Sequence, residues 1–60
     1  MLRERLGMSQ AEFSAAYRIP LASIRQYEIG RHMPSPGVRA YLKVIAAEPE
    51  VAARALRAAA

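Results

Sequence analysis

Few side chains in this chain of 60 residues could do chemistry. The sequence holds no cysteine and no aspartate, and His32 is its only histidine. A lone histidine has no companion ligand to hold a metal ion and no nucleophile beside it to activate. The five acidic residues are glutamates at expected helix ends or exposed positions, where capping and surface pairing explain them. This inventory excludes an enzyme and predicts no metal, no cofactor and no small-molecule ligand.

The chain carries an excess of positive charge. Nine lysines and arginines stand against five glutamates, which gives a formal net charge of +4. A small basic domain is typical of proteins that bind a polyanion, and nucleic acid is the first candidate. The sequence has no run of about 18 apolar residues that could span a membrane, and its first residues lack the apolar core of a signal peptide. We therefore expect a cytoplasmic protein with no membrane partner.

Two short helices joined by a tight turn are expected within residues 9–30. Ser9 can cap the first helix, expected over 9–17, and Glu12 can accept a bond from the Ser9 N–H to complete a capping box. The second helix is expected over 21–29, and the glycine that follows can end it in a left-handed conformation. The apolar side chains that would join the two helices recur at helical spacing: Met8, Phe13, Ala16, Tyr17, Ile19, Ile24 and Tyr27.

This stretch resembles the helix-turn-helix of the phage-repressor-like (Cro/C1, or XRE) family of bacterial DNA-binding proteins. The resemblance is carried by Gly7-Met8-Ser9-Gln10, by the apolar positions Phe13, Tyr17, Ile19, Ile24 and Tyr27, and by Glu28-x-Gly30-Arg31 and Pro34. It implies an all-α, compact five-helix, lambda-repressor-like domain over residues 1–60. The stretch over 41–49 looks like the end of antitoxin-type members, which suggests an antitoxin or a close relative.

The turn departs from the family pattern at two positions. Arg18 stands where the family usually has glycine, because the backbone there tends toward positive φ; arginine can adopt that conformation at a cost of about 1 kcal/mol. Pro20 stands where serine or threonine usually caps the next helix. Proline has no side-chain acceptor, although it suits the opening position of a helix. These two departures leave the first residue of the second helix undetermined, but they do not argue against the helix itself.

The resemblance implies which residues read DNA bases. In the family the outer face of the second helix enters the major groove, and the positions that match its base readers are Leu21, Ala22 and Gln26. Arg25 on the same face is expected to reach guanine or a phosphate. Gln26 can make a bidentate bond to adenine, whereas Leu21 and Ala22 offer only apolar contact, for instance to a thymine methyl. The alternative for Leu21 is packing against the preceding helix or a partner.

Phosphate contacts are implied at Gln10, Ser23, Arg31 and His32. Gln10 lies in the first turn of a helix, where the backbone N–H groups are themselves good phosphate ligands. Arg31 and His32 directly follow the second helix, and in the family cations at this place can bind the DNA backbone. The alternative for Gln10 is an exposed amide without a partner. The alternative for Arg31 and His32 is a loop in which both side chains are only solvated.

The resemblance also implies an ion pair between Arg3 and Glu28. It would fasten the first helix, expected over 1–6, to the end of the reading helix. The alternative is two solvated charges, worth about 0–1 kcal/mol if they meet at the surface. Because the first helix begins abruptly, we expect either that residues precede it in a longer natural protein or that the chain has been trimmed.

Two closing helices are expected over 36–47 and 49–59. Ser35 caps the first of them and Pro36 occupies its opening position. Glu48-Pro49 separates the two, because proline disfavours the helical conformation in the residue before it. The last helix carries an apolar stripe that has few partners left in so short a chain, so it either covers the first helix or forms a dimer contact.

Two functions are compatible with these features. The first is a sequence-specific DNA-binding transcription regulator that reads double-stranded DNA as a homodimer, with half-sites about 34 Å apart or a multiple of that distance. The resemblance implies a repressor, and an autoregulating one if the protein is the antitoxin of a toxin–antitoxin pair. The alternative is a protein-interaction module that holds a partner such as a toxin and binds DNA weakly or not at all.

Overall fold

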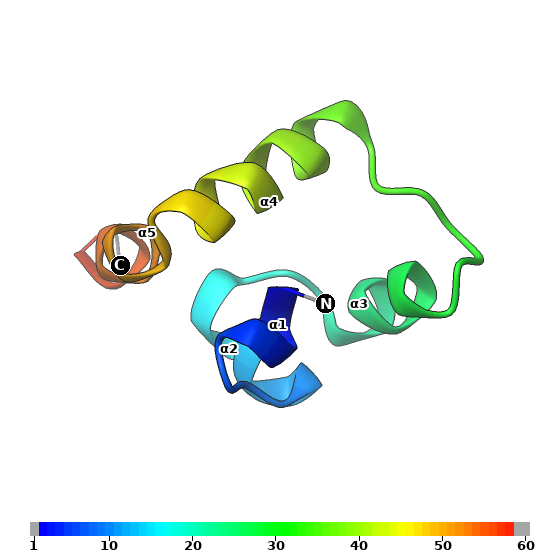
Figure 1. Ribbon diagram of the computed structural model, residues 1–60, viewed down its shortest axis with the longest axis horizontal. Helices are drawn as coiled ribbons and strands as arrows, with labels where there is room; N and C mark the ends of the chain where they lie inside the picture. Colours follow the sequence, from blue (N-terminus) through cyan, green and yellow to red (C-terminus); the bar gives the residue numbers. More distant parts are fainter. Residues whose placement is uncertain (1, 59–60) are drawn as a thin grey trace.

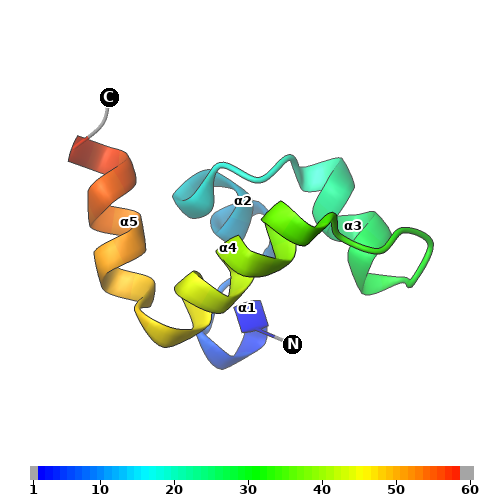
Figure 2. The ribbon, with the colours of Figure 1, turned by 90° about the horizontal axis from the view of Figure 1, so that it is seen from above.

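The computed structural model describes residues 2–58, and within that range it contains five helices and no strand. The helices are α1 (Leu2–Arg5), α2 (Gln10–Tyr17), α3 (Leu21–Glu28), α4 (Pro36–Ala47) and α5 (Pro49–Ala58). The predicted all-α class and the order of the helices are confirmed. In two perpendicular views α3 and α5 lie at opposite ends of the molecule, and α4 runs between them (Figure 1, Figure 2). No helix in the described range is long and apolar enough to cross a membrane.

The predicted helix bounds differ from the structure by a residue or two. Leu6 and Gly7 form a turn after α1, with Gly7 at φ +70°, so the helix ends before the predicted Leu6. Ile29, expected to be helical, is instead the C-cap of α3 at φ −91° and ψ 2°. The predicted helix ends at Met1 and Ala59 lie outside the described residues.

The predicted capping box starts α2. The Ser9 N–H donates to Glu12 Oε1 at 2.8 Å, and the Glu12 N–H donates to Ser9 Oγ at 3.1 Å. These two bonds satisfy N–H groups that have no partner within the helix. Met8 and Phe13 flank this cap at the staple positions, with Phe13 buried in the core and Met8 packed against it. The start of α2 is therefore fixed by local sequence.

Arg18 adopts the left-handed conformation that the family pattern predicts for this turn, with φ 56° and ψ 38°. Its side chain explains how the position tolerates a residue other than glycine. Arg18 Nη2 donates to the Leu56 carbonyl of α5 at 2.9 Å. The Ser14 hydroxyl donates to the Ile19 carbonyl at 2.6 Å and closes the turn from the other side. The turn is thus held by two side-chain bonds as well as by its backbone.

The closing helices begin and end as predicted at Ser35 and at Glu48-Pro49. Ser35 Oγ accepts a bond from the Val38 N–H at 3.3 Å, and Glu48 is the C-cap of α4. α5 packs chiefly against α2 and α4 rather than against the first helix. Ala52 of its apolar stripe is buried, whereas Val51 stays 48% exposed.

The core lies where α2, α3, α4 and α5 converge. Its buried side chains are Phe13, Tyr17, Ile19, Ile24, Ile45 and Ala52. Two tyrosine hydroxyls also bond backbone carbonyls across the core: Tyr17 donates to the Pro49 carbonyl at 3.0 Å, and Tyr41 donates to the Tyr17 carbonyl at 2.9 Å. These bonds satisfy polar atoms at the edge of an otherwise apolar core and tie α2 to the closing helices.

Candidate nucleic-acid interface

The structure presents the outer face of α3 to solvent. Ala22 and Arg25 are exposed, and Leu21, Ser23 and Gln26 are half-buried. Ile24, on the opposite face, is 4% exposed and belongs to the core. The inner side of α3 therefore packs against the core, and its outer side, which carries all the predicted base readers, faces solvent.

Leu21 occupies the first turn of this face. It is only half-buried, and it is not among the described apolar side chains that pack against the core. Together with the exposed Ala22 it forms a small apolar surface at the amino end of α3. Apolar side chains at such a position can contact thymine methyl groups, whereas Gln26, one turn further along, can make paired hydrogen bonds.

Three side chains from three helices meet at the carboxyl end of α3. Arg3 Nε donates to Glu28 Oε2 at 2.7 Å, and Arg3 Nη2 donates to Glu28 Oε1 at 3.0 Å. Gln10 Nε2 also donates to Glu28 Oε1, at 3.0 Å. Arg3 Nη1 donates to the Met8 carbonyl at 3.3 Å, which anchors the guanidinium to the α1–α2 junction. The last residue of α3 is thereby bonded to both preceding helices.

This cluster is more than a pair of solvated surface charges. The Arg3 and Glu28 side chains are only 21% and 15% exposed. The hydrogen bond from Arg3, supported by a smaller effect of Gln10, holds the pKa of the Glu28 carboxyl below its ordinary value of 4.5, although desolvation acts in the opposite direction. The same bond raises the pKa of Arg3. Both groups are therefore charged at neutral pH, and the acidic residue of α3 adds no unpaired negative charge beside the outer face of α3.

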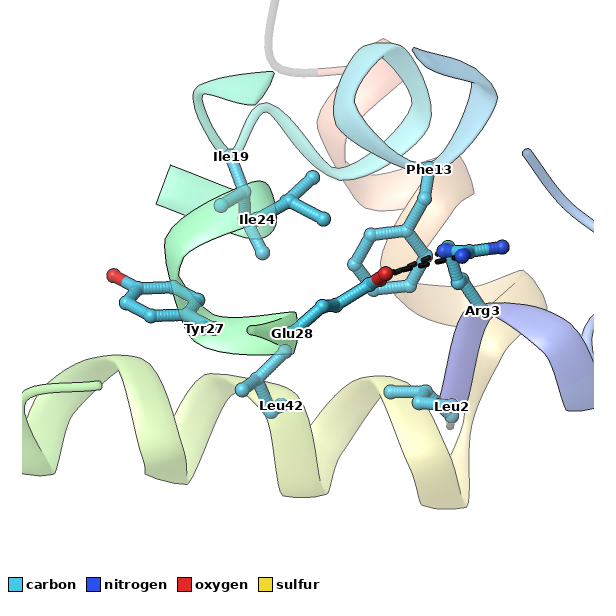
Figure 3. Close-up of a pocket in the computed structure, with 8 residues that line it drawn as sticks. All are labelled: Leu2, Arg3, Phe13, Ile19, Ile24, Tyr27, Glu28 and Leu42. Carbon is cyan, nitrogen blue, oxygen red and sulfur yellow. Dashed lines mark hydrogen bonds and ion pairs between the residues drawn. The ribbon is translucent and has the colours of Figure 1, made fainter. Parts of the chain in front are cut away.

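An apolar hollow of about 230 Å³ lies beneath this ion pair. Its walls come from α1, α2, α3 and α4 and include Leu2, Phe13, Ile24, Tyr27 and Leu42. Arg3 and Glu28 lie at its edge (Figure 3). The hollow separates the inner side of α3 from α4, so close packing of α3 is provided mainly by α2. The ion pair at the far end of α3 consequently has a large share in holding that end in place.

The loop after α3 carries the predicted cations. Arg31 and His32 are both exposed. His32 shares a second hollow, of about 470 Å³, with Ala22, Ser23, Gln26 and Tyr27 of α3. The structure thus brings His32, one predicted phosphate contact of the loop, next to α3, whereas Arg31 is not part of this group.

Sequence reasoning missed two residues of the second hollow. Met33 and Ser35 line it opposite α3, and Met33 is 77% exposed. A signal for Met33 was present in the sequence, since a large apolar residue follows Arg31 and His32 in a loop that has no apolar periodicity. For Gln10 the structure corrects one alternative, because the amide is bonded to Glu28 and does not lack a partner.

Two helices joined by a three-residue turn, with the second helix exposed along one side, define a helix-turn-helix protein. A family model described as helix-turn-helix matches residues 1–38. The chain is also similar to the crystal structure of an XRE-family-like helix-turn-helix protein from Agrobacterium tumefaciens. The two share 51% sequence identity and a TM-score of 0.91 over 92% of this chain and 89% of that one. Among curated proteins none matches the chain.

The chain belongs to the XRE family of helix-turn-helix proteins. This family is one of DNA-binding transcription regulators, and its fold is not typically enzymatic. The predicted family and the predicted DNA-binding class are confirmed at this level.

Proposed function

We propose that this protein is a repressor that binds its operator as a homodimer, with α3 of each protomer in a major groove. One observation carries the proposal: α3 is exposed along its outer face while its far end is tied to α1 and α2 through Glu28. A helix that reads base edges must be both accessible and held at a fixed angle, because base contacts depend on the direction of each side chain.

Sequence choice is assigned to four side chains of α3. Gln26 makes a bidentate bond to adenine, and Arg25 bonds guanine or a nearby phosphate. Leu21 and Ala22 contact thymine methyl groups. The proposed half-site is therefore read partly by apolar contact, and it should favour A·T pairs beside the amino end of α3.

Positioning on the DNA is assigned to Gln10, Ser23, Arg31 and His32. Gln10 uses one amide N–H for Glu28, and its second N–H is a donor for phosphate. Arg31 and His32 are exposed directly after the Ile29 cap. Contacts of this kind set the register of the protein on the duplex but carry no sequence information.

The dimer is assigned to the corner between α4 and α5. Val44 and Val51 are 53% and 48% exposed there, which is high for valine. One domain of this size covers little DNA, so useful specificity requires two copies. The same corner supports a second candidate function, in which the protein is an antitoxin that holds a cognate toxin. Size-exclusion chromatography with light scattering, on the wild type and on Val51→Lys, tests the dimer: the wild type should elute as a dimer and the variant as a monomer.

Selection of bound sequences from random duplexes tests the DNA-reading role. The wild type should enrich one motif, and Gln26→Ala should lose the preference at one base position, with a discrimination loss of about 1–3 kcal/mol there. Uniform weakening at all positions would make Gln26 a backbone contact. Affinity should also fall steeply with salt, since phosphate contacts release counterions. A flat and weak salt response, without an enriched motif, would favour the protein-interaction module.

A further inference from the structure

The apolar hollow of about 230 Å³ under the Arg3–Glu28 pair lies on the inner side of α3, opposite to the face that is assigned to DNA. Figure 3 shows Phe13 and Ile24 above this space and Leu2 and Leu42 below it, with Glu28 across its edge. Protein interiors are close-packed and hold few voids larger than a water molecule. A hollow of this size beside the core of a chain of 60 residues therefore needs a physical explanation.

The lining of the hollow offers hydrocarbon and few polar atoms. Phe13, Ile19 and Ile24 in its wall are buried core residues. No buried side-chain nitrogen or oxygen among residues 2–58 lacks a hydrogen-bond partner, so none of them requires a ligand. A water molecule in a cavity needs about two to four polar partners. Water consequently gains little in this hollow, whereas an apolar molecule would lose no hydrogen bonds on entering it.

The volume sets the size of a suitable ligand. An apolar cavity of about 150 Å³ lined by leucine, isoleucine and phenylalanine holds benzene. The larger hollow in this protein, of about 230 Å³, accommodates a molecule of one or two fused aromatic rings.

The edge of the hollow determines which charge the ligand can carry. Arg3 and Glu28 bond one another through two contacts of 2.7 and 3.0 Å, so their charges balance. An ionised ligand would give up its hydration without gaining an unpaired opposite charge. One polar group on an uncharged ligand can lie at this edge, because Arg3 provides donors there and Glu28 provides acceptors.

We propose that this hollow is a binding site for an uncharged, largely apolar molecule of one or two aromatic rings. The bound molecule packs between Phe13 of α2, Ile24 of α3 and Leu42 of α4. It fills the space that separates α3 from α4, and it stabilises the fold because it binds the folded chain alone. The site lies on the inner side of α3 and does not rest on the proposed function, so either proposal can fail while the other stands.

Titration with 5-fluoroindole, followed by ¹⁹F NMR and by thermal unfolding, tests the proposal. The matched charged compound is 5-fluoroindole-3-carboxylate, which has the same rings. Leu42→Phe places a larger side chain in the wall of the hollow. Ala40→Phe is the control variant, because Ala40 is exposed on the same helix and does not line the hollow. Circular dichroism establishes that both variants are folded.

We expect 5-fluoroindole to bind the wild type with a Kd of about 0.1–1 mM, as is usual for so small a compound. At about ten times that concentration the Tm should rise on the order of 5 °C. The carboxylate should bind about tenfold more weakly or not at all, because its charge would be buried without a partner. Leu42→Phe should also weaken the binding of 5-fluoroindole about tenfold, since the added ring occupies its space. Ala40→Phe should bind like the wild type.

Methyl signals labelled with ¹³C locate the bound compound. The ring current of 5-fluoroindole should shift the signals of Leu2 and Ile24, which line the hollow. Val51 of α5 is the internal reference, because it is 48% exposed and does not line the hollow. Equal shifts at all three residues would indicate unspecific binding to exposed apolar surface and would overturn the proposal.

Two further results would overturn the proposal. Equal affinity of Leu42→Phe and the wild type would place the compound outside the hollow. An unchanged ¹⁹F signal with the wild type would show that the hollow does not take such a molecule. If Leu42→Phe then also lowered the Tm, the space would be filled by protein, either by a segment of the chain outside residues 2–58 or by a second copy.

Discussion

Arg3 in the short helix α1 and Glu28 at the end of α3 are joined by two hydrogen bonds, of 2.7 and 3.0 Å, across 25 residues of sequence. A four-residue helix has little stability of its own, so α1 depends on such tertiary contacts to stay formed. The relation is mutual, because the same bonds hold the carboxyl end of α3. Stability and DNA affinity are therefore expected to respond together to changes at this pair.

Arg3→Ala tests that coupling. Glu28 would lose two of its three hydrogen bonds and α1 would lose its link to α3, so the Tm should fall on the order of 5 °C for a domain of this size. DNA affinity should fall several-fold in the same variant, because α3 would no longer be held at one angle. Thermal unfolding and fluorescence anisotropy give the two quantities. Arg5→Ala, an exposed arginine in the same helix, is the control and should change neither; a Tm unaltered in Arg3→Ala would remove the coupling.

The pH dependence of stability follows from the lowered pKa of Glu28. The carboxyl is ionised and bonded in the folded state, and its ordinary pKa is 4.5. Because the folded pKa is the lower one, the contribution of Glu28 is fully present above about pH 4.5 and is lost as the pH falls through the folded pKa. The Glu12 carboxyl, held below its ordinary pKa by the Ser9 N–H, adds to the same loss.

Denaturant unfolding between pH 7 and pH 3 measures this loss. The wild type should keep its stability down to about pH 5 and lose it steeply below pH 4.5. Glu28→Gln should be less stable at pH 7 and show a shallower loss in acid. Arg3→Ala should produce the same shallower profile, since it removes the main cause of the shift. Parallel curves for Glu28→Gln and the wild type would contradict this account.

The local signals in the sequence predicted the fold well, whereas the side-chain contacts between distant elements could not be predicted. The capping box at Ser9 and the break at Glu48-Pro49 each depend on neighbouring residues, so a pattern of a few residues suffices. The contact of Arg18 with the Leu56 carbonyl joins positions 38 residues apart and depends on where α5 docks. The Arg3–Glu28 pair was accessible only through the family resemblance, because nothing in the spacing of two charges indicates that they meet.

The candidate site shows the same difference between features set by local sequence and features set by contacts between distant elements. The outer face of α3 follows from helical periodicity once Ile24 is assigned to the core. The hollow at Met33 does not, because it depends on the path of an irregular loop relative to α3. Periodicity gives no information about a loop, and an exposed methionine is significant only when its neighbours in space are known.

Arg18 allows the strain of the turn to be measured. A residue other than glycine in the left-handed conformation costs roughly 1 kcal/mol, and Arg18 recovers part of this through its bond to Leu56. Arg18→Ala should lose the bond and keep the strain, whereas Arg18→Gly should lose both. The glycine variant should therefore be more stable than the alanine variant by about 1 kcal/mol in denaturant unfolding. An alanine variant equal to or more stable than the glycine variant would show that φ at this position is not strained.

Ile45 and Val44 are neighbours on α4 with opposite environments. Ile45 is 0% exposed and Val44 is 53% exposed. Truncation of a fully buried isoleucine to alanine costs about 2–5 kcal/mol, and a chain of this length has a total stability of roughly 3–9 kcal/mol. Ile45→Ala should therefore leave much of the protein unfolded at 37 °C, as seen by circular dichroism, while Val44→Ala should change the stability of the protomer by less than about 0.5 kcal/mol. Because Val44 belongs to the proposed dimer corner, the unfolding of the Val44→Ala variant is measured at two protein concentrations. A stability loss that appears only at the higher concentration assigns Val44 to the dimer contact. A loss independent of concentration would place Val44 in the core, against the structure.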